Sequence, residues 1–219
     1  MHSMMKKFKG LRQACHFGPT LIVTAIGWIF SNHYWWEGPA YVIAFGIFCG
    51  QLVVGWTNDL YDYKDDVQHK RIKKPLVTGL ITPAYLRTWI IFMTPFSFFA
   101  NLAGPLGLKG GLVYMLGIGC GIAYNFYFKF TLFSPLPYAI AFAALPSSIA
   151  ISKEIMPPTW MWLGGALFGM AAHFINVIKD MEEDQQSGIK GLPQRLGKKR
   201  SILVAILLIA LGSLALYSQ

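Results

Sequence analysis

GQLVVGWTNDLYDYKDD, residues 50–66, passes directly from an apolar segment into one that carries four carboxylates. The rest of the chain has little negative charge. Of its 219 residues, 54% are hydrophobic and 13% are charged, and the formal net charge is +9. This composition is typical of a protein that crosses a membrane several times. A cluster of acids at the end of an apolar segment is costly in such a protein, and it marks a candidate functional site.

Apolar runs near the roughly 20 residues that a bilayer requires predict seven membrane spans. They lie at residues 18–36, 39–57, 85–104, 108–128, 136–152, 158–178 and 201–218. The fold predicted from this pattern is an all-α, multi-pass transmembrane helical bundle.

Positive charge is distributed very unevenly over the loops between these spans. The span map places seventeen of the nineteen Lys and Arg residues on one side and only Lys109 and Lys153 on the other. Because cytoplasmic loops retain positive charge, we expect a multi-pass protein of the cell membrane with a cytoplasmic N-terminus. The net charge then reflects topology, and no nucleic-acid partner is expected.

Eight of the ten acidic residues form two clusters, at the ends of the second and sixth predicted spans and on the predicted cytoplasmic side. They are Asp59, Asp62, Asp65 and Asp66 in the first cluster and Asp180, Glu182, Glu183 and Asp184 in the second. A transporter would be expected to carry its acids nearer the middle of the membrane, so their position disfavours transport.

The two clusters share one register if both continue as helices. It reads Asn58, Asp62, Asp66 in the first and Asn176, Asp180, Asp184 in the second. Steps of four residues place these groups on one helical face, where the carboxylates repel one another by roughly 0.2–0.5 kcal/mol per pair. Mg²⁺ prefers oxygen ligands and often combines one or two carboxylates with substrate phosphates. The register therefore predicts two strips that bind a diphosphate through Mg²⁺.

A plainer interpretation is that these acids are solvated loop residues that balance nearby Lys and Arg. The repeated register favours the ligand interpretation, while Asp65, Glu182 and Glu183 lie outside it and are expected to be solvated or supporting residues. His173 lies on a similar face to Asn176, where it either orients a ligand or is an ordinary buried histidine.

Basic segments follow both clusters, and they suit the chemistry of a diphosphate. Arg71, Lys74 and Lys190 are candidates for binding phosphate oxygens and stabilising the leaving group. The alternative is that these cations only follow the topological bias of charge.

At this point the sequence resembles the UbiA superfamily of intramembrane prenyltransferases. Residues 58–66 fit its NDxxDxxxD motif, and residues 180–184 fit its DxxxD motif. The strings KPLVTG at 74–79 and GIKGLPQRLG at 188–197 are also similar to that family. The segment ACHFGPT at 14–20 looks like a poorly characterised actinobacterial branch.

The resemblance implies a bundle of nine spans around a central cavity capped on the cytoplasmic side. The chain would be a single UbiA-like domain over residues 1–219 that lacks the last two spans of the family. Matched positions imply that Mg²⁺ is held by Asp59, Asp62, Asp66, Asp180 and Asp184, of which Asp62, Asp66, Asp180 and Asp184 are catalytic. The expected diphosphate-binding residues are Asn58, Arg71, Lys74, Tyr124, Lys129, Asn176 and Lys190; Tyr124 and Lys129 are similar to a family Tyr and Lys, and Asn176 follows from the internal register.

The activity implied is Mg²⁺-dependent transfer of a prenyl group from a polyprenyl diphosphate to an undetermined small or lipid acceptor, among membrane lipids. A terpene cyclase or a lipid-phosphate phosphoribosyltransferase is the alternative within the same family. A transporter or a structural membrane subunit is the alternative outside it.

Overall fold

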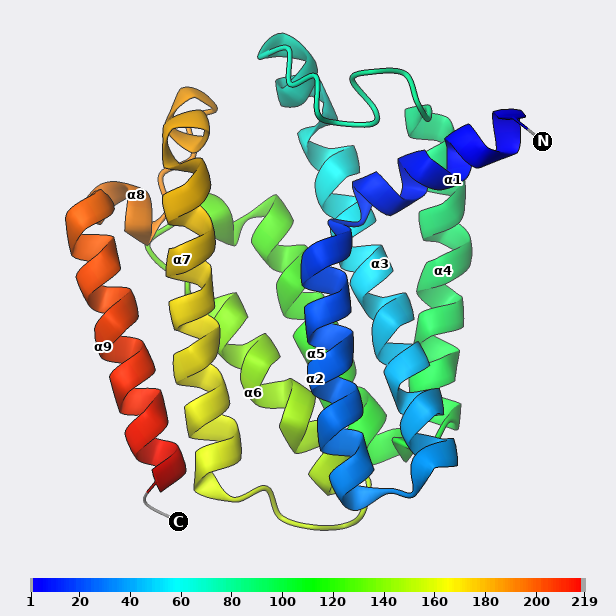
Figure 1. Cartoon of the computed structure of the whole chain (residues 1–219), viewed down its shortest axis with the longest axis vertical. Coiled ribbons are helices and arrows are strands. Elements are labelled where there is room, and N and C mark those ends of the chain that lie inside the picture. The colour runs from blue at the N-terminus through cyan, green and yellow to red at the C-terminus, as the bar shows by residue number, and fades with distance from the viewer. Residues whose placement is uncertain (1, 218–219) are drawn as a thin grey trace. The chain divides into compact units, whose positions relative to one another are not determined.

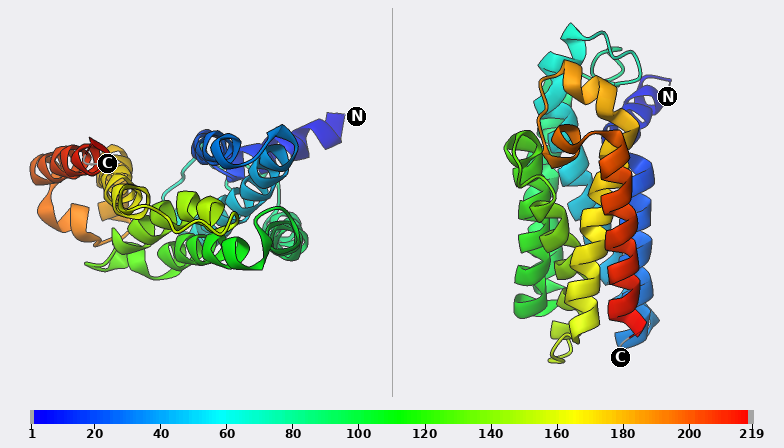
Figure 2. Two further views of the ribbon diagram at one scale, coloured as in Figure 1. Left: turned by 90° about the horizontal axis from the view of Figure 1, so that it is seen from below. Right: turned by 90° about the vertical axis from the view of Figure 1, so that its left-hand side faces the viewer.

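The computed structural model describes residues 2–217, without the side chains of His2 and Ser3. Within this range the chain is helical and contains no strand (Figure 1), which confirms the all-α fold class. The chain divides into two compact units, here called unit 1 (Met1–Gly107) and unit 2 (Leu108–Gln219). Figure 2 shows the helices in two further views.

Unit 1 consists of four helices, of which the longest, α3, packs against both α2 and α4. They are α1 (His2–Ala14), α2 (Phe17–Tyr34), α3 (Glu37–Gln68) and α4 (Pro83–Ala103). The contact between α3 and α4 contains a buried polar link, because Asn101 Nδ2 donates to the Gly46 carbonyl over 3.0 Å. Gly46 permits this approach, since a Cβ there would lie 2.7 Å from Asn101 Oδ1.

Helices α1 and α2 meet at a bend of 68°. His16 forms the corner with φ 51° and ψ 60°, which is the left-handed region of the backbone. On the α1 side of the bend, Gly10 packs directly against Ile81 of the loop that precedes α4.

Unit 2 packs its long central helix α7 against α6 and α9. Its elements are α5 (Gly107–Phe126), the 3₁₀ turn η1 (Phe128–Phe130), α6 (Leu136–Ile151), the π-helical turn η2 (Trp160–Gly164), α7 (Gly165–Gln186), α8 (Leu192–Leu196) and α9 (Lys198–Tyr217). Glycines allow the close contact of α6 and α7: a Cβ on Gly165 would lie 2.6 Å from the Phe142 carbonyl, and one on Gly169 would lie 2.4 Å from the Tyr138 carbonyl.

Each predicted span falls on a helix as far as residue 217. By length and composition, four helical stretches in the described chain suit a membrane crossing: Glu37–Gln68, Gly107–Phe126, Trp160–Gln186 and Lys198–Tyr217. The bent pair Met4–Ala14 and Phe17–Tyr34 makes five if it counts as one span. The total of seven spans stays a prediction.

Helices α3 and α7 both continue beyond the predicted spans, to Gln68 and Gln186. The prediction that both acidic clusters continue their helices is therefore confirmed. Each cluster occupies the C-terminal turns of a long helix.

We expect Gly169→Ala to destabilise unit 2 by about 1–3 kcal/mol, because the new methyl group would overlap the backbone carbonyl of Tyr138. Gly119→Ala in α5 is the matched control, since a Cβ there meets nothing within 4 Å. Thermal unfolding of the purified protein in detergent measures both. Equal unfolding temperatures for the two variants would contradict the packing account.

Candidate functional site

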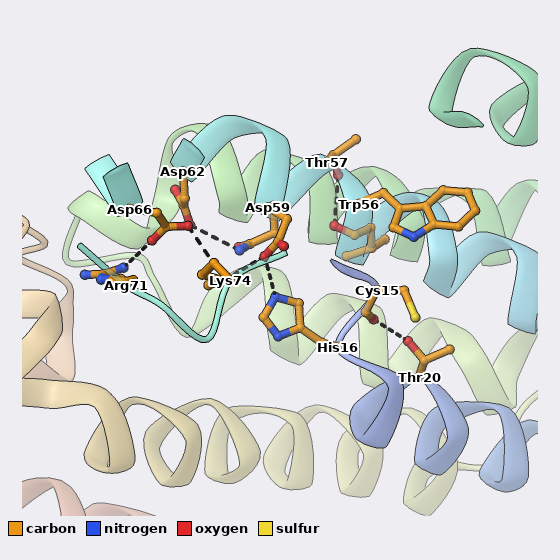
Figure 3. A network of polar contacts seen from close by, with 12 residues as sticks. Cys15, His16, Thr20, Trp56, Thr57, Asp59, Asp62, Asp66, Arg71 and Lys74 are labelled. Atoms are coloured by element: carbon orange, nitrogen blue, oxygen red, sulfur yellow. Dashed lines mark hydrogen bonds and ion pairs between the residues drawn. The ribbon is translucent and has the colours of Figure 1, made fainter. Parts of the chain in front are cut away.

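The first acidic cluster lies on the last turns of α3, where two of its carboxylates are buried (Figure 3). Asp59 and Asp66 are each 1% exposed, and Asp62 is half-buried. Asn58 Nδ2 donates to Asp62 Oδ2 over 3.1 Å, which confirms that the four-residue register brings these two side chains together.

The loop after α3 places both of its candidate cations on these carboxylates. Lys74 Nζ lies 2.6 Å from Asp59 Oδ1 and 3.9 Å from Asp66 Oδ2. Arg71 Nη1 donates to Asp66 Oδ1 over 2.8 Å. Asn58, whose amide holds Asp62, completes a compact polar cluster within unit 1.

Apolar packing fixes the course of this loop. Leu76 and Ile81 are buried in a cluster with Trp56 of α3 and Leu86 of α4. The loop therefore has a fixed core on one side and the two ion pairs on the other. Charge and packing together hold Lys74 near the helix.

The buried charges at this helix end compensate one another. Burial alone would lower the pKa of the Lys74 ammonium, but the Asp59 carboxylate, with smaller contributions from Asp66 and Asp62, raises that pKa above its ordinary value. Lys74 therefore stays protonated at neutral pH. Removing either partner of such a pair leaves an uncompensated buried charge.

Asp65 lies outside the four-residue register, and its contacts are more exposed to solvent than those of Asp59 and Asp66. Its side chain is 35% exposed, and its carboxylate lies 3.2 Å from His69 Nδ1 and 3.6 Å from Arg71 Nη2. Asp65 therefore lies beside the buried pairs and helps to hold Arg71.

His16 is a neighbour of the cluster that sequence reasoning missed. Its Nε2 lies 3.4 Å from Asp59 Oδ1, although the two residues are far apart in sequence. The only sequence signal was its place in the segment at 14–20, which pointed to lineage and not to a site.

The oxygen-rich end of α3 fits a hard divalent cation in its chemistry. Among residues 2–217 no group of three or more His, Cys, Asp or Glu side chains converges as a closed metal cage. Asp59 Oδ2, however, is buried and has no hydrogen-bond partner. A carboxylate oxygen without a partner, one turn from Asp62, suits Mg²⁺, which completes its shell with waters and substrate oxygens.

The second cluster lies on the last turns of α7 and is more open to solvent. Asp180 is exposed, while Asp184 is half-buried and its Oδ2 accepts from Gln194 Nε2 over 2.8 Å. Asn176 shares a hydrogen bond with Tyr138 of α6. Lys190 is exposed in the following loop, where its carbonyl accepts from Arg195 Nε over 2.8 Å.

His173 is fully buried beneath this cluster and joins three segments of unit 2. Its Nε2 lies 3.1 Å from Ser134 Oγ, which also accepts from the Leu192 amide over 3.0 Å. The rings of Tyr124 and Tyr138 lie 5.4 and 4.9 Å from the imidazole, between ring centroids. This arrangement supports a structural role for Nε2, while Nδ1 is buried and has no hydrogen-bond partner.

The structure thus assembles the predicted residues of unit 1 more tightly than those of unit 2. Tyr124 lies in the aromatic group around His173, and Lys129 is 5% exposed with its Nζ 5.3 Å from the centre of the Phe130 ring. Their predicted part in diphosphate binding, and the action of both acidic strips on one ligand, stay predictions.

Comparison with known proteins supports one family. The sequence model of the UbiA prenyltransferase family matches residues 5–219. No curated protein matches the chain.

Solved structures with a similar fold include a UbiA homologue from Archaeoglobus fulgidus bound to DMAPP and Mg²⁺. Its TM-score is 0.79 at 17% sequence identity, and the match covers 94% of this chain and 76% of the homologue. The same homologue bound to GPP and Mg²⁺ gives a TM-score of 0.75 at 17% identity, over 97% and 76% of the chains. The apo UbiA homologue from Aeropyrum pernix K1 gives 0.71 at 17% identity, over 90% and 75%. At this identity the likeness shows the fold.

Lys74→Met is expected to lower the free energy of unfolding by about 3 kcal/mol, because it removes the ammonium group that compensates the buried Asp59 carboxylate. Because the pKa of Lys74 is raised in the folded protein, the stabilisation by the ion pair is fully present below the ordinary lysine pKa and disappears only as the pH rises through the raised pKa. The destabilisation caused by Lys74→Met should therefore be constant from about pH 6 to pH 9. Denaturant titration in detergent micelles measures it.

Lys109→Met is the control for this variant, because the Lys109 to Glu154 pair is exposed and 3.9 Å apart. It should change stability by less than about 0.5 kcal/mol. Asp59→Asn on the Lys74→Met background should recover part of the loss. An equal effect of the two lysine substitutions would refute the importance of the buried pair.

Proposed function

This chain belongs to the UbiA prenyltransferase family, and on that premise we propose that it moves a prenyl group from a polyprenyl diphosphate to an acceptor within the membrane. The family consists of integral membrane enzymes that transfer prenyl groups. The whole of residues 1–219 acts as one domain in this proposal. Its N-terminus and both Asp motifs face the cytoplasm, in agreement with the bias of Lys and Arg.

The observation that carries this proposal is the polar cluster at the end of α3. It combines buried carboxylates, which attract a divalent cation, with Lys74 and Arg71, which attract phosphate. A diphosphate with its Mg²⁺ presents both kinds of charge at once. The Archaeoglobus fulgidus homologues, which are bound to DMAPP or GPP with Mg²⁺, are in keeping with a ligand of this class.

The residues that would hold Mg²⁺ are Asp59, Asp62, Asp66, Asp180 and Asp184. When bound, Mg²⁺ supplies Lewis-acid stabilisation of the charge that develops on the leaving diphosphate. The proposed ligands of the diphosphate itself are Asn58, Arg71, Lys74, Tyr124, Lys129, Asn176 and Lys190.

The reaction breaks the bond between the allylic carbon and the diphosphate oxygen and forms a bond from that carbon to the acceptor, which loses a proton. Arg71, Lys74 and Lys190 stabilise the departing oxygens as they gain charge. The apolar helices that surround the prenyl chain exclude water, which would otherwise trap the allylic cation.

Transport is the less favoured function, because both acidic clusters lie at helix ends. Asp59 to Asp66 occupy the last turns of α3, and Asp180 to Asp184 those of α7, whereas a transport pathway carries its charges nearer the membrane centre. Prenyl transfer, terpene cyclisation and phosphoribosyl transfer differ in product. Incubation with labelled prenyl diphosphates of several lengths, followed by identification of the labelled product, separates the first two, because a phosphoribosyltransferase would not use a prenyl diphosphate as its donor.

The purified chain should release pyrophosphate from geranyl diphosphate only when Mg²⁺ is present. Asp62→Asn and Asp180→Asn should each lower this rate by about 100-fold or more, because each removes a charge that compensates the metal. Glu182→Gln, outside the register on α7, is the matched control and should keep the rate. A coupled pyrophosphate assay measures all four proteins, and full activity of either Asp variant would exclude that motif.

If both motifs act on one diphosphate, the double variant Asp62→Asn with Asp180→Asn should be scarcely slower than the slower single variant. Residues that act together on one transition state have non-additive effects on its free energy, whereas residues that act independently lower the rate multiplicatively. Pyrophosphate release by the four members of the cycle measures the coupling. Multiplicative losses would show that the two aspartates contribute independently to the rate.

A further inference from the structure

We propose that His16, at the corner between α1 and α2, is a positioning residue of the diphosphate site that orients the Asp59 carboxylate. The inference rests on the proposed function of that site. It assigns a role to a residue that belongs to neither Asp motif and lies more than forty positions before Asp59 in the chain.

The backbone at His16 adopts a conformation that few residues other than glycine tolerate. With φ 51° and ψ 60° it lies in the left-handed region, which residues other than glycine adopt uncommonly and in which Asn, Asp and His are enriched. Only Lys70 and Glu154 share a positive φ among the non-glycine residues of the described chain. A residue held in such an uncommon conformation is a candidate for a functional role.

The corner is fixed to the same helix that carries the first motif. Trp56 Nε1 of α3 donates to the Leu11 carbonyl over 2.9 Å, just before the bend. Gly55 lets the Cys15 backbone approach so closely that a Cβ there would lie 2.5 Å from the Cys15 carbonyl oxygen. Thr20 Oγ1 donates to that carbonyl over 2.8 Å. These contacts lie one turn before Asp59, so they attach the bend to the part of α3 that carries the first motif.

His16 reaches a motif carboxylate that has a buried oxygen without a hydrogen-bond partner. Asp59 Oδ1 has Lys74 Nζ at 2.6 Å and His16 Nε2 at 3.4 Å, while Asp59 Oδ2 is buried without a hydrogen-bond partner. Two groups beside one oxygen fix the rotation of the carboxylate about its Cβ–Cγ bond. The other oxygen then remains in place for a ligand.

Of the two partners of Asp59 Oδ1, His16 is more exposed to solvent than Lys74. The His16 side chain is 45% exposed, compared with 22% for Lys74, so the imidazole forms the accessible side of this contact. Its 3.4 Å separation from Asp59 exceeds the usual hydrogen-bond length of about 2.7–3.2 Å. Such contacts tighten in the ligand complex, so binding should draw the imidazole toward the carboxylate.

His16→Gly and His16→Asn test this role, because both residues accept the left-handed backbone and neither places an imidazole against Asp59. We expect each variant to unfold at the wild-type temperature or above it. We expect each to bind geranyl S-thiolodiphosphate in the presence of Mg²⁺ about tenfold more weakly, and to need several-fold more Mg²⁺ for half-maximal pyrophosphate release. Calorimetry on the full chain in lipid nanodiscs measures binding without turnover.

Glu154→Gly is the matched control, since it changes a residue with the same positive φ in an exposed loop, where the side chain forms an ion pair with Lys109. It should leave binding and Mg²⁺ dependence unchanged. Wild-type binding and Mg²⁺ dependence retained by both His16 variants would overturn the inference. So would a lowered unfolding temperature in both, which would mark a structural role. Failure of the wild-type chain itself to bind the analogue would instead reject the proposed function.

Discussion

The burial of two carboxylates at the end of α3 is the constraint on which unit 1 depends. Asp59 and Asp66 are almost fully removed from solvent, and such charges are tolerated only when cations and hydrogen-bond donors meet them. Lys74 and Arg71 do so, and the loop after α3 must therefore fold back along the helix end. The same requirement concentrates positive and negative charge in one place, as recognition of a metal and a diphosphate demands.

The folded loop in turn fixes the position of α1. Ile81, buried in the cluster that anchors the loop, contacts Gly10 so closely that no side chain fits there. Trp56 Nε1 donates to the Leu11 carbonyl and makes a second attachment. The first helix is thus fastened to the motif helix at several points, and the strained corner at His16 follows from that attachment.

In unit 2, neutral groups hold the acidic end of α7 and the segments around it. Asp184 accepts a hydrogen bond from the Gln194 amide, and the first residue of α8 is linked to α7 through Ser134, which contacts both His173 and the Leu192 amide. No Lys or Arg of the described chain forms an ion pair with Asp180 within 4.0 Å. The exposed Asp180 carboxylate therefore keeps more of its charge available to a cation than the paired carboxylates of α3 do.

The sequence by itself determined the helical class, the place of the helices that coincide with the seven predicted spans, and the continuation of α3 and α7 through the acidic clusters, because hydrophobic length and four-residue spacing are local properties. The helices α1 and α8 lie outside those spans and were not predicted. Tertiary structure alone decided which groups meet Asp59. Lys74 approaches it because Leu76 and Ile81 pack into a core, and His16 approaches it because Gly55 and Trp56 fix a bend. No local pattern encodes such contacts, since they depend on the packing of segments that are distant in sequence.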